Sequence, residues 1–297
     1  MYVKELTEPV VVKWAELMPK WVVPHATEPG YLRFNLSYVG GAEGLVNINR
    51  ETNLLSDRTA IGLMWMPVGQ RQFALHCHTT AETYVILKGA VESIEPDLES
   101  IEPDDRFHYV GTLDCMHMPV GSPHAARTVG TEDVMLLWFH DGLEAADAAI
   151  YYDENDPRLS GLPRIRRIKL DSLAPSWDAP GAREAGTLRS LTSYIGGPSG
   201  YLNYNRETCV VSERNAAGTT MIPVGNAEVP QAYGTTRYCL VLSGEAAVVD
   251  HPEVPVAGSW DMIIMPRNAP YAVRAVGIEP LHMLWILEDA EPEKKAA

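Results

Sequence analysis

Hydrophobic positions along the chain fall into short runs rather than long amphipathic stretches. Runs rich in β-branched and aromatic residues, such as ETYVILKG at 82–89 and RYCLVLSG at 237–244, alternate with clusters of Gly, Pro, Asn and Asp. No apolar period of 3.6 residues persists over the length of a helix. The pattern therefore predicts an all-β chain built from β sandwiches or barrels.

The pattern occurs twice. The segment SYVGGAEGLVNINRETNLLSDRTAIGLMWMPVG, which begins at Ser37, is similar to SYIGGPSGYLNYNRETCVVSERNAAGTTMIPVG, which begins at Ser193. A constant offset of 156 residues separates Ser37 from Ser193 and Gly69 from Gly225. Self-similarity at a fixed offset indicates that one structural unit has been used twice.

The domain boundaries follow from this repeat. The offset falls to 147 where LDCMHMPVGSPH, ending at His124, matches WDMIIMPRNAPY, ending at Tyr271, because the first copy carries the acidic insertion VESIEPDLESIEPDD. A chain of 297 residues has room for two domains. We expect a first domain with its leading segment at 1–150, a Pro-rich linker at 151–180, a second domain at 181–288 and a disordered tail at 289–297.

Candidate metal ligands lie close together after Gly69. Side chains two residues apart on a strand share one face, so His76 and His78 point the same way. Glu82 has the same parity and stays on that face if the strand continues, or returns to it if TTA makes a turn. A turn rich in Pro and Gly, MPVGSPH, brings His124 to the start of the next strand. Three imidazoles and one carboxylate are thus predicted to converge.

This donor set suits one divalent first-row transition metal per chain. Fe or Mn is favoured, and Ni, Co, Cu and Zn stay open because ligand type alone does not choose among them. Four protein ligands on a six-coordinate metal leave two positions for substrate, water or dioxygen. The alternative is that the four side chains only hydrogen-bond one another, which would cost on the order of several kcal/mol of desolvation without a cation.

These residues resemble the two sequence motifs of the cupin superfamily, and the duplication resembles the two-domain bicupins. The first motif is followed by Gly69, His76, His78, Glu82 and Gly89, and the second by Asp114, Pro119, Gly121 and His124. The resemblance covers residues from about 37 to 288. It implies one double-stranded β-helix, or jelly-roll, barrel per copy, with the metal inside the first.

The sequence departs from the cupin pattern at three positions. Six residues instead of five separate Gly69 from His76, Leu113 stands where Gly is usual, and Thr128 stands where Asn is usual. None of these departures removes a ligand. The superfamily includes dioxygenases, decarboxylases, isomerases, lyases, aminohydrolases and non-catalytic binders, so the resemblance does not fix the reaction.

The second copy serves as an internal comparison, because it lacks all four ligands. The corresponding residues are Gln231, Tyr233, Arg237 and Tyr271. We therefore expect the second barrel to bind no metal and to act as scaffold or pocket wall. Residues shared by both copies, such as Tyr38 with Tyr194 and Trp138 with Trp285, are assigned to packing.

Residues found only in the first copy are candidates for substrate binding and catalysis. Trp65, His117 and His140 face Met221, Ile264 and Leu287 in the alignment. Tyr84 shares the parity of Glu82 and offers a phenol to substrate. We predict catalytic roles for Glu82, His140 and Tyr84 and substrate contacts for Trp65, His117 and Tyr84. The alternative for each is a hydrogen-bonded structural side chain.

Composition and charge narrow the class of partner. The chain has 24 basic and 39 acidic residues and a net charge of −15, which disfavours nucleic acid and anionic membrane surfaces. No apolar run reaches the roughly 18 residues that span a bilayer, and the start lacks the apolar stretch of a signal peptide. The four cysteines show no C-x-x-C spacing. We expect a cytoplasmic protein that acts on a small molecule, and the apolar leading segment makes a homodimer plausible.

Three functions stay open from the sequence. The favoured one is a mononuclear dioxygenase or other oxygenase acting on a small organic acid, enol, diketone or phenol. The second is non-redox metal catalysis by an isomerase, lyase or hydrolase, with Glu82, His140 or Tyr84 as base. The third is a small-molecule binding protein that leaves its ligand unchanged.

Overall fold

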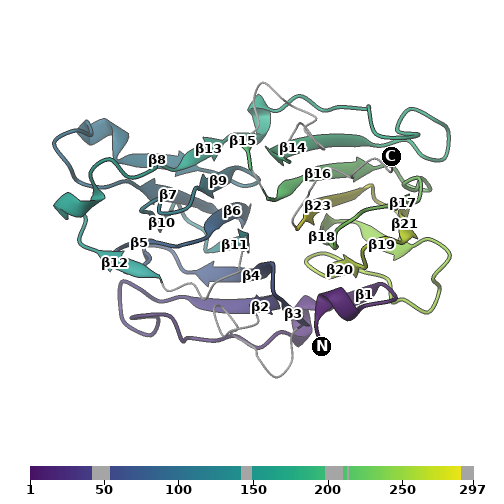
Figure 1. Cartoon of the computed structure of the whole chain (residues 1–297), viewed down its shortest axis with the longest axis horizontal. Coiled ribbons are helices and arrows are strands. Elements are labelled where there is room, and N and C mark those ends of the chain that lie inside the picture. The colour runs from purple at the N-terminus through teal and green to yellow at the C-terminus, as the bar shows by residue number, and fades with distance from the viewer. Residues whose placement is uncertain (42–53, 142–148, 198–209, 213, 289–297) are drawn as a thin grey trace, which may run out of the picture. The chain divides into compact units, whose positions relative to one another are not determined.

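The chain folds into two compact units made almost entirely of strands. The computed structural model describes residues 1–41, 54–141, 149–197, 210–212 and 214–288 (Figure 1). One unit comprises Leu17–Leu170 and is called the first barrel; the other comprises Met1–Glu16 with Asp171–Ala297 and is called the second barrel. None of the helices in the described ranges has the length and apolar character needed to cross a bilayer. The predicted all-β fold is confirmed.

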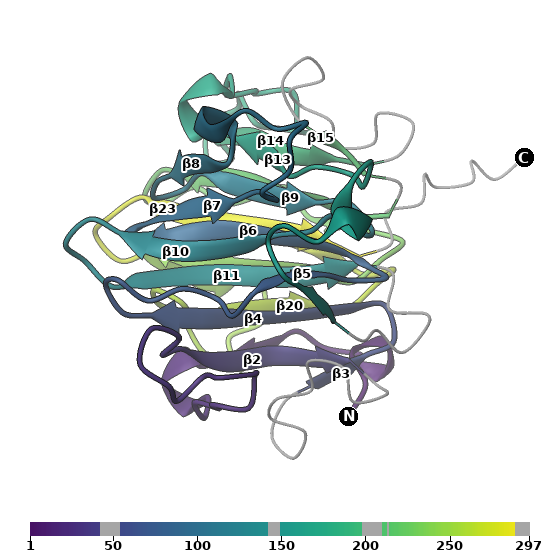
Figure 2. The same cartoon turned by 90° about the vertical axis from the view of Figure 1, so that its left-hand side faces the viewer.

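The first barrel is organised around a seven-stranded sheet in the order β13-β9-β6-β11-β4-β2-β3, part of which is seen face on in Figure 2. A three-stranded sheet, β10-β7-β8, and the pair β12-β5 complete the unit. The strands are β2 (Phe34–Gly41), β3 (Leu54–Ser56), β4 (Thr59–Met66), β5 (Leu75–Cys77), β6 (Ala81–Lys88), β7 (Ala90–Ile94), β8 (Phe107–Val110), β9 (Cys115–Met118), β10 (Ala125–Val129), β11 (Val134–Asp141), β12 (Ile150–Tyr152) and β13 (Arg166–Ile168).

The second barrel has a seven-stranded sheet in the order β1-β20-β18-β23-β16-β14-β15, with the pairs β17-β21 and β19-β22 beside it. Its strands are β1 (Val10–Val12), β14 (Ser190–Gly196), β15 (Val210–Val211), β16 (Ala216–Ile222), β17 (Gln231–Ala232), β18 (Arg237–Ser243), β19 (Glu245–Val248), β20 (Met262–Met265), β21 (Pro270–Tyr271), β22 (Val273–Val276) and β23 (Leu281–Leu287). Short 3-10 helices are η1 (Val3–Glu5), η2 (Trp14–Glu16), η3 (Pro103–Asp105), η4 (Pro157–Leu159) and η5 (Leu170–Ser172).

The first strand of each repeat joins the barrel that is formed mainly by the other repeat. β1 and β13 are 156 residues apart, so they are equivalent strands of the two copies. β1 pairs with β20 of the second barrel, and β13 pairs with β9 of the first. The lysine that follows each strand repeats this exchange: Lys13 bonds Asp261 at 2.7 Å, and Lys169 bonds Asp114 at 3.0 Å. The two sheets therefore have the same strand order even though their edge strands are exchanged.

This exchange corrects the domain boundaries expected from the sequence. Met1–Glu16, expected at the start of the first domain, belongs to the second barrel. Much of the expected linker at 151–180 belongs to the first barrel, because β12 and β13 join its sheets. The reason is that the first repeat begins before residue 37. In the second repeat, the Pro-rich segment contains the opening strand, β13. The tail at 289–297 lies outside the described residues.

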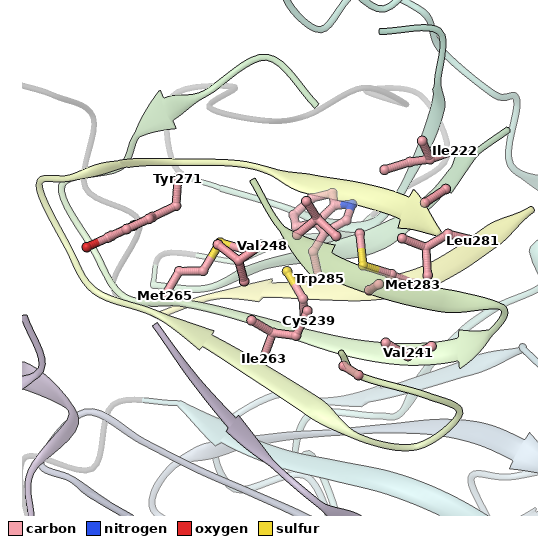
Figure 3. Close-up of a cluster of buried hydrophobic side chains, with 14 of the residues drawn as sticks. Ile222, Cys239, Val241, Val248, Ile263, Met265, Tyr271, Leu281, Met283 and Trp285 are labelled. Atoms are coloured by element: carbon pink, nitrogen blue, oxygen red, sulfur yellow. The ribbon is translucent and has the colours of Figure 1, made fainter. Parts of the chain in front are cut away.

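Both barrels bury an apolar interior from alternate strand positions. In the second barrel, side chains of β16, β18, β20 and β23 meet around Trp285, including Cys239, Ile263 and Met283 (Figure 3). In the first barrel the corresponding cluster contains Met64, Tyr84, Met116 and Trp138. Burial of this kind is the main term that stabilises small β domains.

Packing explains why one tryptophan is kept in each copy. A Cβ atom added to Gly62 would lie 2.2 Å from the Trp138 indole, and one added to Gly218 would lie 2.5 Å from the Trp285 indole. Each indole therefore lies flat against a strand that has no side chain at that point. Tyr38 and Tyr194 are fully buried in the same way, in agreement with their assignment to packing.

Candidate metal centre

Two segments far apart in sequence bring the candidate ligands together. His76 lies in β5, and a pair of backbone hydrogen bonds of 3.0 and 2.9 Å joins it to His124 just before β10. Glu82 lies in β6, next to β11 on one side and β9 on the other. One ligand atom each from His76, His78, Glu82 and His124 lies within 4.8 Å of the others. The structure thus brings together all four residues that the sequence pattern selected.

The Glu82 carboxylate is at the centre of this cluster. Its Oε2 atom lies 2.9 Å from His124 Nε2 and 3.4 Å from His78 Nε2. His124 donates its Nδ1–H to the Ser122 carbonyl at 2.9 Å, which leaves Nε2 with its lone pair directed into the cluster. Only 5% of Glu82 and 1% of His124 is exposed, so solvent does little to compete for these groups.

The electrostatics keep Glu82 and His76 in the protonation states that bind metals. Burial alone would raise the pKa of Glu82, but the neighbouring His140, His78 and His124 lower it well below its usual value. Burial, together with His124 and His78, lowers the pKa of His76 well below that of a free imidazole. At neutral pH the carboxylate is therefore ionised and His76 neutral, which are the ligating forms.

The residues present fit a divalent transition metal. Three imidazole nitrogens and one carboxylate oxygen form a donor set that such cations prefer. His76 Nδ1 is buried and has no hydrogen-bond partner among the described residues, so the cluster does not satisfy itself. An unsatisfied buried polar atom is costly, and a cation among these donors offsets the desolvation of the whole group.

His140, predicted as a catalytic residue, supports Glu82 from the neighbouring strand. The two residues are paired across β11 and β6, and His140 Nε2 lies 3.1 Å from Glu82 Oε1. On its other side, His140 Nδ1 lies 3.1 Å from Thr80 Oγ1. The chain Thr80–His140–Glu82 therefore fixes the carboxylate oxygen that does not contact His124.

Replacing His140 by Leu, the residue that the second copy carries at Leu287, is expected to weaken metal binding about 10- to 100-fold, because outer hydrogen bonds orient a metal-ligating carboxylate. Titration of the metal-free protein with Mn²⁺ measures this. Thr80→Val, which removes the more distant hydrogen bond, should give a smaller loss. Unchanged affinity in His140→Leu would contradict the supporting role.

A cavity of about 140 Å³ opens beside the cluster. Tyr84, predicted as a catalytic and substrate-binding residue, lines it and accepts a hydrogen bond of 2.9 Å from Gln72 Nε2. Gln72 is itself held by the backbone N–H of Ala126 at 2.8 Å. Burial and the nearby Glu82 raise the pKa of Tyr84 well above its ordinary value, so its phenol stays protonated. The lining is completed by Val23, Arg33, Asn35, Met64, Trp138, Ala149 and Tyr151.

Two predicted substrate-binding residues do not line this cavity. Trp65 stacks on Phe34, with ring centroids 4.9 Å apart, while its neighbour Met64 faces the cavity. His117 lies opposite Thr83 across β9 and β6, and its Nδ1 is 2.9 Å from Thr83 Oγ1. The physical reason is strand parity, because positions next to inward-facing residues point to the other face.

His117 makes the fold sensitive to acid. Burial, with the Arg166 charge, lowers the pKa of His117 to about 4. Because this folded-state pKa is below that of an unfolded histidine, the contribution of neutral His117 is present above about pH 6.5 and is lost as pH falls towards 4. The full shift corresponds to about 3 kcal/mol. In urea unfolding of the metal-free protein, His117→Ile should reduce the loss of stability over this range. Equal pH slopes for both proteins would rule this out.

Sequence reasoning missed four polar residues of the cavity: Arg33, Asn35, Gln72 and Tyr151. Tyr151 lies in the segment expected to be a linker, and its ring stacks near His76 with centroids 5.6 Å apart. Arg33 precedes β2 and recurs as Arg189 in the second copy, but it lies before the repeated segment recognised from Ser37 and was not considered. The available signal was a charged residue directly before an apolar strand.

Backbone conformation accommodates two of the departures from the cupin pattern. Ala74, in the lengthened segment before His76, has a φ of +54°, and Leu113, at the usual glycine position, has a φ of +63°. Both values lie in the left-handed region that glycine adopts most easily. The turns into β5 and β9 are therefore made without glycine, and the ligands still converge.

The second barrel has a different arrangement at the corresponding place. Arg237, the counterpart of Glu82, donates two hydrogen bonds of 2.7 and 2.6 Å to the carboxylate of Glu228. Tyr233 donates to Gln231 at 3.0 Å. Only about 10 Å³ of free space is left beside these residues. A buried ion pair thus fills the interior where the first barrel has its candidate metal site.

Comparison with known proteins yields matches in structure. No protein-family model and no curated protein matches the sequence. Among solved structures, oxalate decarboxylase from Lactobacillus farciminis, in a formate complex, aligns over 95% of this chain and 86% of its own with a TM-score of 0.61 and 12% identity. The Bacillus subtilis oxalate decarboxylase studied for its Mn(II) centres covers 95% and 78%, with a TM-score of 0.56 and 14% identity. AerE from Microcystis aeruginosa covers 95% and 98%, with a TM-score of 0.57 and 12% identity.

These likenesses extend over nearly the whole chain, so they concern both barrels and not one alone. The fold consists of two all-β, jelly-roll barrels and is shared with the oxalate decarboxylases, and the fold class is as the sequence predicted. At identities of 12 to 14%, the structural likeness establishes the fold and does not identify the reaction. The reaction has to be argued from the site.

Proposed function

We propose that this chain is a metal-dependent enzyme that binds one divalent transition metal in its first barrel and acts on a small organic molecule. The observation that carries the proposal is the convergence of His76, His78, Glu82 and His124 within 4.8 Å beside a cavity of about 140 Å³. Fe and Mn are the metals that we favour. Mn gains support from the Bacillus subtilis neighbour, which has Mn(II) centres.

Within this proposal, the second barrel binds no metal. Its interior has a guanidinium group, Arg237, where the first barrel has the Glu82 carboxylate, and a cation repels a second cation. The nearby phenol of Tyr233 and amide of Gln231 bond each other instead of facing an open position. The second barrel then acts as scaffold.

The bound metal would supply a Lewis acid and open positions for substrate or dioxygen. Residues of the chain position the groups around the metal. Tyr84 holds its proton and presents it to the cavity, and Gln72 fixes the phenol oxygen. His140 and Thr80 hold the Glu82 carboxylate in place. Trp138 and Met64 line the cavity with apolar surface, which reduces the water around the reacting groups.

For the reaction we propose oxygenation of a small organic substrate. Three imidazoles and one carboxylate leave coordination positions for substrate and dioxygen on a six-coordinate metal. Oxygen uptake by Fe- or Mn-loaded protein, screened against small acids, enols, diketones and phenols, tests this. Uptake that disappears in His76→Ala would support oxygenation. Full turnover of a substrate under strict anaerobiosis would exclude it.

A second candidate is non-redox carbon–carbon bond cleavage by a lyase. It is favoured by the oxalate decarboxylases among the structural neighbours and by a cavity of about 140 Å³ that can hold a small organic molecule. Carbon dioxide release without oxygen uptake would select this reaction. Retained activity with Zn²⁺ in place of the native metal would also favour it, because Zn²⁺ has no redox chemistry.

A further inference from the structure

The interior of the first barrel contains a buried positive charge that no described side chain neutralises. Arg33 is 4% exposed and lines the cavity beside the candidate ligands. Its guanidinium donates to the carbonyls of Tyr31 at 3.1 Å and Pro24 at 3.0 Å, and it has no ion pair with a carboxylate in the described part of the chain. A buried charge without a counter-charge is costly.

The second barrel shows what the repeat does with the same arginine. Arg189 is 2% exposed and donates to the carbonyl of Pro180 at 2.9 Å, in the same way that Arg33 bonds Pro24. This shared bond is the structural role of the arginine. Arg189, however, lines its pocket together with the Glu228 carboxylate. Although burial raises the pKa of Glu228, the charges of Arg237 and Arg189 bring it below its usual value.

A residue that lines the pocket with the arginine differs between the barrels. Gln72 is the counterpart of Glu228, so the first barrel has a neutral amide where the second has a carboxylate. Among the described residues that line the first cavity, Glu82 alone has a carboxylate, and it is engaged by His78, His124 and His140. Among the described residues, the first barrel therefore keeps the buried arginine and has no carboxylate at the position where the second barrel has Glu228.

We propose that Arg33 binds the carboxylate of the substrate, so that the molecule taken up by this site is a small organic anion. The proposal deepens the proposed function and rests on it, because the anion would lie between Arg33 and the metal ligands. The cavity of about 140 Å³ has room for a small organic anion. Asn35, Tyr84 and Tyr151 supply further polar contacts from the lining.

The test is calorimetric titration of the Mn-loaded and the metal-free protein with formate, acetate, glycolate and oxalate, against the uncharged acetamide and glycolamide. At least one carboxylate should bind, and acetate or glycolate more tightly than its amide. Arg33→Gln should weaken carboxylate binding about 10- to 100-fold, the range for a charge-assisted hydrogen bond. Arg189→Gln, the matched change in the second barrel, should leave it within about threefold, since Arg189 belongs to the other unit.

A second variant controls for the case in which Arg33→Gln loses carboxylate binding because it misfolds. Gln72→Glu introduces the residue of the second barrel, and the new carboxylate can accept from the Ala126 N–H as Glu228 accepts from Val273 N–H at 3.2 Å. It should pair with Arg33 and weaken carboxylate binding to a similar extent in a protein that melts like the wild type. Carboxylate affinity unchanged in both Arg33→Gln and Gln72→Glu, or amides that bind as well as acids, would overturn the proposal.

The outcomes also separate this proposal from the function on which it rests. Removing the positive charge of Arg33 should strengthen Mn²⁺ binding or leave it unchanged, because a cation near the site opposes a second cation. If Mn²⁺ binds and carboxylate affinity does not depend on Arg33, the carboxylate proposal alone fails. If Mn²⁺ does not bind and carboxylates still bind the metal-free protein through Arg33, the metal-dependent function alone fails.

Discussion

Replacing His76 by Ala is expected to lower the affinity for Mn²⁺ or Fe²⁺ at least about 100-fold and to abolish metal-dependent activity. Structural Zn²⁺ sites with four ligands bind with about 10–16 kcal/mol, which corresponds to about 3 kcal/mol, or about 100-fold, for each ligand. Metal titration of refolded or chelator-treated protein measures the loss. His76 also forms a short backbone bridge with His124, and this bridge does not depend on its side chain.

The duplicated chain offers a matched control for this experiment. Gln231→Ala changes the corresponding position in the second barrel, and it should leave both metal affinity and activity within about twofold of the wild type. If Gln231→Ala lowered metal binding as much as His76→Ala, the metal site would not be confined to the first barrel. If neither substitution had an effect, the ligand assignment would be wrong.

The second large effect is expected in the second barrel. Arg237→Met should destabilise the protein by about 3–5 kcal/mol, because it leaves the Glu228 carboxylate buried without its bidentate partner. The double variant Glu228→Gln, Arg237→Met should recover most of this loss, since both charges are then removed and Gln is the residue found at the corresponding Gln72. Urea unfolding of the three proteins measures the free energies.

Metal content provides the control for that series. Because the substitutions lie in the second barrel, the first barrel of each variant should still bind one equivalent of Mn²⁺ when folded. A single variant as stable as the wild type would show that the ion pair contributes nothing. A double variant no more stable than the single one would show that the loss comes from packing around Arg237 and not from the unpaired charge.

Much of the fold and the whole ligand set could be predicted from the sequence, because both depend on local pattern. The internal repeat identifies two copies of one unit, and strand parity places His76, His78 and Glu82 on one face before any long-range contact is known. His124 follows from a turn rich in Pro and Gly. The structure brings all four together.

Other features depend on contacts that a local pattern does not contain. The exchange means that β1 pairs with β20 and β13 pairs with β9. The short sequences of β1 and β13 do not show which barrel each strand joins. Trp65 and His117 were selected because they differ between the copies, but a difference does not show which way a side chain points. Arg33 was overlooked because it lies before the repeated segment recognised from Ser37, and its burial beside the cavity depends on long-range contacts.

The central claim is that one cation is held by the first barrel and none by the second. The most direct measurement is elemental analysis of protein loaded with Mn²⁺ or Fe²⁺ and then freed of excess metal. We expect one equivalent per chain, lost in His76→Ala and kept in Gln231→Ala. Two equivalents per chain, or none at metal concentrations well above the cellular range, would contradict the account.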